Sequence, residues 1–350
     1  MRRNPVDIYA IQKSIDLANR GIEQNQKIES WVEVYEYDSV PIRVKHYSCE
    51  PRTYRRDGVA VAYSHQILVH GVVSSDDYFS GFSTDMAELG ISSSVIDLPR
   101  LPNCMLLNQD FNLLDWQVDA VSTISQKISN DLGLTRDGRG FILGGHSRGG
   151  KLAVKAASQL AKTDCAMAGL LLLAPAGFHD IADANRFKAV GLAARMGAYA
   201  LRHPSTITQH APMIIRTVAK SPLQSYMEID DALSASVVND LIPLVTPPHP
   251  TPVMIITANA DEFISERLIA EALDEHGLLD LMQYLAMSSV ASNHMLGIIS
   301  THNAISKADP NTVSGKALQF NQALAPEYSP LAINGVNGSI SRLMRLHGQR

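Results

Sequence analysis

Hydrophobic residues recur through the middle of the chain in short runs that are apolar on both faces. The predicted strands are Val59–Val69, Ser93–Asp97, Gly140–Leu143, Gly169–Ala174, Val253–Thr257 and Leu281–Met287. Strands of this kind are typical of a parallel sheet covered on both faces. The predicted intervening helices are Thr84–Leu89, Leu114–Leu132, Arg148–Lys162, Ser265–His276 and Leu296–Ser306. The pattern predicts an α/β fold with a mostly parallel central sheet and helices on both faces.

Two other patterns precede this region. Residues 1–30 have apolar positions at helical spacing, which predicts an N-terminal helix. Trp31–Tyr37 and Pro41–Tyr47 alternate apolar and polar residues on either side of Asp38-Ser39. Alternation of this kind predicts an antiparallel hairpin, which belongs at an edge of the sheet.

The segment 178–250 interrupts the alternation of strands and helices. It contains no convincing strand and is rich in Ala, Met and Arg, so we expect a helical insertion, or lid. The core would then comprise residues 31–177 and 251–306. After it, residues 307–350 turn to Asn, Pro, Ser and Gly, which predicts an irregular tail with a short terminal helix.

Composition and charge narrow the class of protein. The 350 residues are 45% hydrophobic and 19% charged, as in an ordinary globular protein. The net charge of -5 provides no basic footprint for nucleic acid or anionic lipid. The apolar runs are far shorter than the roughly 20 residues of a membrane helix, so we expect no stable membrane insertion. Without a visible signal peptide, the expected location is cytoplasmic.

The sequence contains no recognisable motif for binding a metal or a cofactor. The three cysteines include no CxxC pair, so neither a disulfide framework nor a zinc site is indicated. The chain also lacks HExxH, an EF-hand loop, GxxxxGKS and a strand-borne GxGxxG. We expect no metal and no cofactor.

The sharpest motif is a GxSxG pentapeptide between a predicted strand and a predicted helix. Its residues are Gly145, His146, Ser147, Arg148 and Gly149. A nucleophile on such a turn adopts strained backbone angles, and Gly145 and Gly149 leave room for neighbouring turns. The start of a helix also favours negative charge. Ser147 is therefore the candidate nucleophile.

A serine nucleophile needs a base to take its proton and a carboxylate to orient that base. Asp261 follows the predicted strand Val253–Thr257 and is the candidate acid, although the adjacent Glu262 stays open as an alternative. His294 follows the last predicted strand and is the candidate base. Less favoured candidates, within or at the ends of helices or in the Pro-rich end of the lid, are Asp280, His302, His276 and His249.

Acyl transfer also requires donors for the oxyanion of the tetrahedral intermediate. We expect one from the backbone N–H of Arg148, directly after the nucleophile. The second is expected from the backbone N–H of Val72, in the glycine turn His70-Gly71-Val72 that follows an earlier strand. We interpret His70 as a structural residue of that loop in preference to an acid or base.

These motifs together resemble the α/β-hydrolase superfamily. The resemblance covers about residues 31–306 and includes His70-Gly71, Asp97-Leu98-Pro99-Arg100, the GxSxG turn, Asp261 and His294 in that order. It implies a doubly covered sheet and a Ser-His-Asp triad. The turn is similar to that of chlorophyllases, and a helical lid resembles monoacylglycerol-lipase-like esterases. One departure is Ala258, where these families often have Gly.

The sequence thus predicts a serine hydrolase of an ester or thioester that acts through an acyl-serine intermediate. The expected substrate is a small molecule with an apolar acyl group. Two alternatives stay open: an acyltransferase or peptidase that uses the same acyl-enzyme, and a non-catalytic small-molecule-binding member of the fold. The oligomeric state does not follow from the sequence.

Overall fold

The computed structural model describes residues 28–48, 54–56, 59–61, 65–72, 74–88, 91–134, 140–163, 165, 167–179, 215–235, 237–246, 250–258, 264–278, 285–290 and 313–323. The strands are β1 (Glu29–Tyr37), β2 (Val40–Ser48), β3 (Tyr54–Arg56), β4 (Val59–Val61), β5 (His65–Val69), β6 (Ser93–Asp97), β7 (Phe141–His146), β8 (Met167–Leu173), β9 (Val253–Ala258) and β10 (Leu285–Val290). The helices are η1 (Asp76–Phe79), α2 (Ser80–Glu88), α3 (Asn103–Leu106), α4 (Leu113–Asp131), α5 (Arg148–Leu160), α8 (Pro222–Ala232), α9 (Val238–Val245), α10 (Glu266–Glu275) and α12 (Val313–Ala323).

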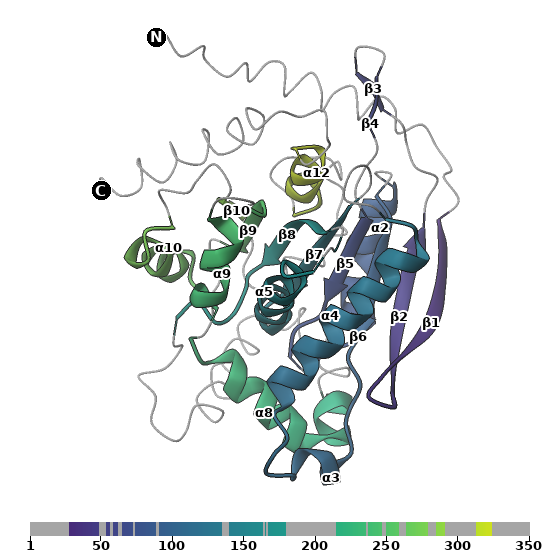
Figure 1. The fold of residues 1–350 in the computed structure, drawn as a ribbon, viewed down its shortest axis with the longest axis vertical. Coiled ribbons are helices and arrows are strands. Elements are labelled where there is room, and N and C mark those ends of the chain that lie inside the picture. Colours follow the sequence, from purple (N-terminus) through teal and green to yellow (C-terminus); the bar gives the residue numbers. More distant parts are fainter. Residues whose placement is uncertain are drawn as a thin grey trace.

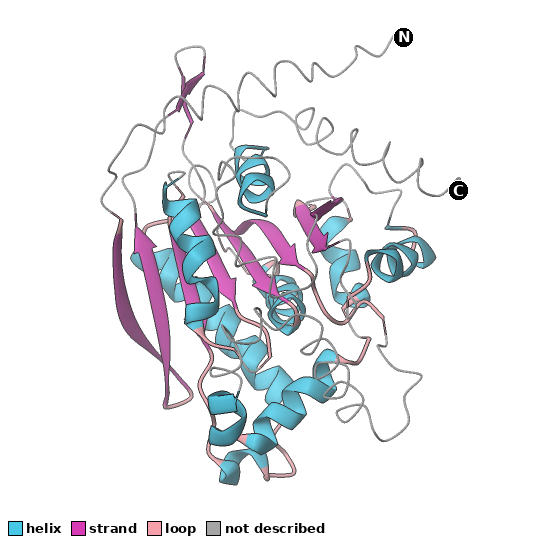
Figure 2. Ribbon diagram, turned by 180° about the vertical axis from the view of Figure 1, so that it is seen from behind, coloured by secondary structure: helices cyan, strands magenta, loops and turns pink. Residues whose placement is uncertain are grey.

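One sheet organises the described part of the chain. Eight strands follow the order β1-β2-β6-β5-β7-β8-β9-β10, with antiparallel pairing of β1 with β2 and of β2 with β6, and parallel pairing elsewhere. Helices α4 and α5 cover one face, and α2 and α12 lie on the other (Figures 1 and 2). The prediction of a mostly parallel sheet with helices on both faces is confirmed.

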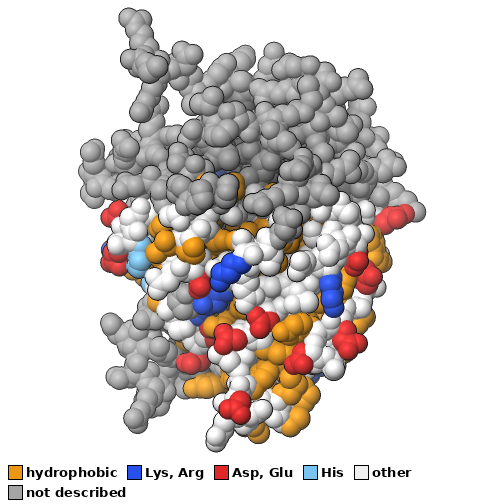
Figure 3. Space-filling view, in the orientation of Figure 1, with side chains coloured by type: hydrophobic (Ala, Val, Ile, Leu, Met, Phe, Trp, Pro, Cys, Tyr) orange, Lys and Arg blue, Asp and Glu red, His pale blue; other side chains and the backbone are white. Residues whose placement is uncertain are grey.

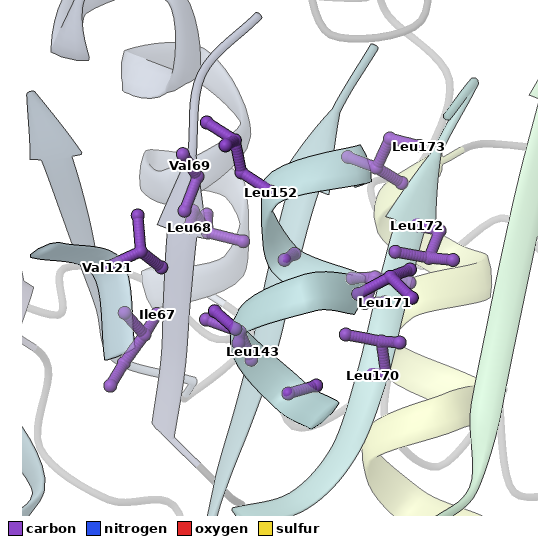
Figure 4. Close-up of a cluster of buried hydrophobic side chains, with 14 of the residues drawn as sticks. Ile67, Leu68, Val69, Val121, Leu143, Leu152, Leu170, Leu171, Leu172 and Leu173 are labelled. Carbon is purple, nitrogen blue, oxygen red and sulfur yellow. The ribbon is translucent and has the colours of Figure 1, made fainter. Parts of the chain in front are cut away.

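The central strands are buried on both faces, which explains their unbroken apolar sequences. Leu170, Leu171, Leu172 and Leu173 of β8 all have 0% exposure, so neither face of this strand reaches water. Figure 4 shows these side chains beside those of β5 and β7, with residues from α4 and α5 packed against them. Burial of each such side chain stabilises the fold by roughly 1.5–3 kcal/mol.

The edge hairpin is also present as predicted. Asp38 and Ser39 have φ angles of 51° and 59°, which are the two positive values that a tight primed turn requires. β1 and β2 pair across this turn from Tyr37 with Val40 to Glu29 with Ser48. The hairpin places β1 at the edge of the sheet.

Several predicted boundaries were wrong. Val59–Val69 is not one strand, because Val59–Val61 forms β4 and pairs with β3 in a separate two-stranded sheet, while β5 starts at His65. The last strand was predicted at Leu281–Met287, whereas the described strand β10 pairs with β9 and continues three residues further, to Val290; residues 281–284 lie outside the described residues. Pairing with a neighbouring strand, which hydrophobicity does not encode, sets these boundaries.

Two helices also differ from their predictions. α2 begins at Ser80 instead of Thr84, since burial of Phe82 outweighs the weak helix propensity of its serines and glycine. Residues 307–350 were expected to be irregular before a terminal helix, yet Val313–Ala323 forms α12. This helix is held by burial of Val313, Ala317 and Phe320, which lie on one helical face.

Other predictions lie outside the described residues. These are the N-terminal helix within residues 1–30, the helix Leu296–Ser306 and the terminal helix. Of the insertion 178–250, the described part between residues 215 and 246 is helical and includes α8 and α9. The division of the chain into core, lid and tail stays a prediction.

The surface mixes residue types. Figure 3 shows acidic and basic side chains among apolar ones on the described part of one face. Among the exposed apolar side chains are those of Leu107, just after α3, and Tyr226 of α8. Within the described residues, no helix is both long enough and apolar enough to cross a bilayer.

A serine shared by two histidines links β2, β5 and β6. The Ser94 hydroxyl lies 2.8 Å from Nδ1 of His46 and 2.7 Å from Nε2 of His65. Burial lowers the pKa of His65 to about 3, helped by the nearby charge of His46. Burial also lowers the pKa of His46, which the Glu33 carboxylate partly opposes. Both rings are therefore held neutral between neighbouring strands.

These lowered pKa values predict acid sensitivity. Unfolding raises the pKa of His65 from about 3 to about 6.5, so the unfolded state binds the proton first as the pH falls. The effect of neutral His65 on the free energy of unfolding is therefore a loss of about 1.4 kcal/mol for each pH unit between pH ~6.5 and pH ~3, with no loss above that range. We expect His65→Gln, whose amide still reaches Ser94, to shift the midpoint of acid unfolding to lower pH, as measured by circular dichroism. The control is His276→Gln at the exposed end of α10; equal shifts in the two variants would contradict the prediction.

Candidate active site

Ser147 occupies a sharp turn between β7 and α5. β7 ends at His146, α5 begins at Arg148, and Ser147 has φ 54° and ψ -123°. Residues other than glycine rarely adopt these angles, and holding serine in them costs of order 1–3 kcal/mol. The Ser147 N–H donates to the Leu173 carbonyl at 3.0 Å, and its carbonyl accepts from the N–H groups of Gly150 at 2.9 Å and Ala176 at 3.0 Å. These bonds hold Ser147 in a strained conformation at the start of a helix.

Glycines make the turn sterically possible. A Cβ on Gly145 would lie 2.2 Å from the carbonyl oxygen of Gly149. A Cβ on Gly149 would lie 2.2 Å from the carbonyl oxygen of Val69, at the end of β5. Both contacts are with backbone atoms, which cannot move aside as a flexible side chain would. The turn therefore packs directly against the end of the neighbouring strand.

The loop after β5 runs beside the nucleophile turn. A Cβ built on Gly71 would lie 3.2 Å from Cβ of Ser147 and 3.2 Å from the His146 carbonyl oxygen. Val72, whose N–H is the second predicted oxyanion donor, follows directly in the chain. The structure thus brings His70, Gly71 and Val72 to the same end of the sheet as Ser147 and Arg148.

His70 holds this loop in place. The His70 ring is buried, and its Nδ1 lies 2.9 Å from the Gly71 carbonyl oxygen. Its Nε2 accepts a hydrogen bond from the Leu98 N–H at 3.3 Å. Nε2 also lies 3.5 Å from Oδ1 of Asp97, the residue before Leu98. The Gly71 carbonyl and the Val72 N–H belong to one planar peptide and point in opposite directions. Fixing the carbonyl therefore also fixes the direction of the Val72 N–H.

A largely buried cluster of charges lies beside the Ser147 turn and includes its neighbours Arg148 and Lys151. Asp231 of α8 accepts from Nε of Arg148 at 2.7 Å and lies 2.6 Å from Nζ of Lys151. Nearby, Glu228 pairs with Arg100 at 3.0 Å. Burial alone would raise the pKa of Glu228, but the charges of Arg148 and Arg100 hold it below its ordinary value. Burial lowers the pKa of Lys151, and Asp231 opposes part of that shift.

No sequence motif points to these carboxylates. Gln224, Glu228 and Asp231 are spaced four and three residues apart, so they form one polar stripe on α8. All three face the body of the protein, where Gln224 accepts from the Leu101 N–H at 2.8 Å. The polar stripe on α8 was visible in the sequence and could have marked this helix face as unusual. It does not show that Arg100, Arg148 and Lys151 are the cations that the stripe contacts.

The predicted acid and base, Asp261 and His294, lie outside the described residues, as do Glu262, Asp280, His302 and His249. The strands that precede Asp261 and His294 are described: β9 ends at Ala258 and β10 at Val290, and both run parallel to β7. Their carboxyl ends therefore share the edge of the sheet at which Ser147 lies. His276 is exposed at the end of α10, where its ring bonds the Ala272 carbonyl. Among the described residues, no group of three His, Cys, Asp or Glu side chains is arranged to hold a metal ion.

A family model described as the alpha/beta hydrolase family matches residues 66–294, well over half of the chain. The chain belongs to the alpha/beta hydrolase family. This confirms the superfamily resemblance carried by the sequence motifs. No curated protein sequence matches this alpha/beta hydrolase significantly.

Solved structures share the fold of this alpha/beta hydrolase at low sequence identity. An N-formylmaleamic acid deformylase from Pseudomonas putida is 14% identical with a TM-score of 0.50, covering 77% of this chain and 96% of that one. A membrane phospholipase A, a bacterial virulence factor, is 14% identical with a TM-score of 0.52 and covers 90% of each chain. Brefeldin A esterase, a bacterial homologue of human hormone-sensitive lipase, is 13% identical with a TM-score of 0.50, covering 91% of this chain and 86% of that one.

Proposed function

We propose that this protein is a serine hydrolase that cleaves a carboxylic ester or thioester through a covalent acyl-enzyme on Ser147. The observation that carries the proposal is the strained backbone of Ser147 between β7 and α5, with the Gly71 loop packed against it. Backbone strain of this kind gathers at functional sites, because only the surrounding structure can maintain it. The order of the candidate residues Ser147, Asp261 and His294, each after a strand, supports the same conclusion.

The chemistry follows from these groups. The Ser147 hydroxyl oxygen attacks the acyl carbon while His294 takes the hydroxyl proton, and Asp261 orients the imidazole. The N–H groups of Val72 and Arg148 stabilise the oxyanion of the tetrahedral intermediate. His294 then returns the proton to the departing alcohol or thiol. Water, activated by His294, releases the acid and regenerates Ser147.

The substrate is a small molecule with an apolar acyl group. The predicted insertion contributes apolar residues, and flexible methionine side chains suit varied acyl chains. The basic residues of the same segment include Arg216 and Lys220, which are exposed on the described part of the insertion. Exposed cations interact weakly with any ligand, so they do not define the substrate.

The test combines active-site labelling with turnover. We expect a fluorophosphonate to label the folded wild-type protein, and p-nitrophenyl esters of increasing acyl length to show a clear optimum in kcat/KM. Asp261→Asn should reduce kcat much further than Glu262→Gln, since the triad carboxylate holds the histidine in the required tautomer. The reverse order would assign the acid to Glu262.

Two outcomes would contradict the proposal. Folded protein that takes no label and hydrolyses no ester would be a binding member of the fold instead of an enzyme. Acylation followed by preferential transfer to an added alcohol or amine, with little free acid, would show an acyltransferase. Analysis of the products by mass spectrometry separates hydrolysis from transfer.

A further inference from the structure

One carboxylate on the inserted helix α8 binds both cations of the nucleophile turn. Oδ2 of Asp231 accepts from Nε of Arg148 at 2.7 Å, and Oδ1 lies 2.6 Å from Nζ of Lys151. Arg148 and Lys151 are one and four residues after Ser147, in the first turn of α5. Their side chains are 3% and 0% exposed and that of Asp231 is 14% exposed, so these contacts are largely shielded from water. Charged hydrogen bonds in such surroundings are stronger than those at the surface.

The position of Asp231 is itself fixed. Nζ of Lys151 also donates to the backbone carbonyls of Asp231 at 2.7 Å and Ser234 at 3.2 Å, at the end of α8. A cation at this end of a helix satisfies free carbonyls and complements the helix dipole. One helix turn earlier, Glu228 is bonded by Arg100 and by Gln117 of α4. α8 is therefore anchored to three separate parts of the body.

Asp231 accepts the side-chain hydrogen bond of Arg148 that the described residues contain. Nη2 of Arg148 is buried and has no hydrogen-bond partner among the described residues. The guanidinium is bonded through Nε to Oδ2 of Asp231 at 2.7 Å, and its charge also acts on the nearby Glu228 carboxylate. Arg148 also contributes the backbone N–H that we assign to the oxyanion, and a donor is effective only within a few tenths of an ångström of its required place.

We propose that Asp231 is a positioning residue, which holds Arg148 and Lys151 so that the Arg148 N–H stays directed at the oxyanion. This inference rests on the proposed function of Ser147. It assigns to the inserted segment a part in the chemistry that is separate from substrate binding. Because Asp231 acts through Arg148, its loss should alter the rate of the chemical step more than the affinity for substrate.

Charge and position predict opposite effects for Asp231→Asn. The cluster contains three cations, Arg100, Arg148 and Lys151, and two carboxylates, Glu228 and Asp231. Removing the charge of Asp231 increases the surplus positive charge beside the oxyanion, which by itself would maintain or raise the rate. If Asp231 acts by position, the rate falls. The direction of the change therefore distinguishes the two roles.

The experiment compares Asp231→Asn with a matched variant at Asp240, an aspartate on the next helix, α9, that also pairs with a cation of α5. Asp240 of α9 pairs with Lys155 at 2.7 Å, two turns further along α5 and away from Ser147. We expect Asp231→Asn to lower kcat for a p-nitrophenyl ester by about 10- to 100-fold with little change in KM. Asp240→Asn should stay within about twofold of wild type in both constants. Wild-type kcat in Asp231→Asn, or an equal loss in Asp240→Asn, would overturn the proposal.

A second readout does not depend on turnover. Amide hydrogen exchange of residues 148–151, followed by mass spectrometry, should become faster in Asp231→Asn and stay unchanged in Asp240→Asn. If Asp231→Asn does not fold, Arg148→Gln removes the same contact while the pair of Lys151 with Asp231 remains, and it should lower kcat similarly. Wild-type protein without label or turnover would refute the proposed function, whereas unchanged exchange in Asp231→Asn would refute the positioning role.

Discussion

Ser147→Ala will abolish ester hydrolysis and fluorophosphonate labelling while the protein remains folded. The substitution removes the attacking oxygen, so the covalent path is lost and kcat should fall by about 10⁵-fold or more. Alanine has the same backbone restrictions as serine, so the strained turn at φ 54° and ψ -123° is kept and the fold should be unaffected. Single-turnover kinetics, intact-mass detection of the label and thermal unfolding measure the three properties.

Ser147→Gly provides the matched control for backbone strain. It should be as inactive as Ser147→Ala, but more stable than that variant by about 1 kcal/mol. The relief of strain at a positive φ exceeds the cost of glycine's greater freedom in the unfolded chain. A glycine variant less stable than the alanine variant would show that the turn is not strained. Label remaining in both variants would place the nucleophile elsewhere.

Gly149→Ala will have the second largest effect, because the new methyl group has no space. Its Cβ would lie 2.2 Å from the carbonyl oxygen of Val69 and 2.4 Å from that of His70. These atoms belong to the backbone that leads into the predicted oxyanion loop, so relief of the clash must move that loop away from Ser147. We expect a loss of about 3 kcal/mol or more in the free energy of unfolding. Protein that still folds should be about 100-fold less active, since a shift near 1 Å has that effect on catalysis.

Gly277→Ala is the control for this substitution. Gly277 has φ +67° and nothing within 4 Å of a built Cβ, so the change adds backbone strain without a clash. It should cost about 1 kcal/mol and leave kcat unchanged. Urea unfolding gives the two stabilities, and initial rates give the activities. Equal losses of stability in Gly149→Ala and Gly277→Ala would mean that the nucleophile turn is not closely packed against β5.

The sequence predicted the parts of the fold that depend on local patterns. β8 was identifiable because it is buried on both faces, and the hairpin because its strands alternate around Asp38-Ser39. The split between β4 and β5 and the extension of β10 to Val290 depend on pairing between strands distant in the chain. α12 was missed because its Val313, Ala317 and Phe320 lie among small and polar residues that weaken the helical pattern.

In the candidate active site, too, local features were predictable from the sequence and long-range contacts were not. Ser147 lies in a motif of five residues, so its surroundings were visible locally. Asp231 is brought to Arg148 across 83 positions of sequence, and only the packing of α8 on α5 makes the two residues neighbours. The polar stripe of α8 shows that one face of the helix is unusual, but the sequence does not show which cations it meets.

The anchoring of α8 limits how this protein could be engineered. Exchange of the segment between β8 and β9 for that of a relative would seem a simple way to alter specificity. Here such a chimera would also remove Asp231 and Glu228, leaving Arg148 and Lys151 charged, buried and uncompensated. An unpaired buried charge typically costs 3–5 kcal/mol. A transplanted segment would therefore have to include both carboxylates, or the recipient would have to lose both cations.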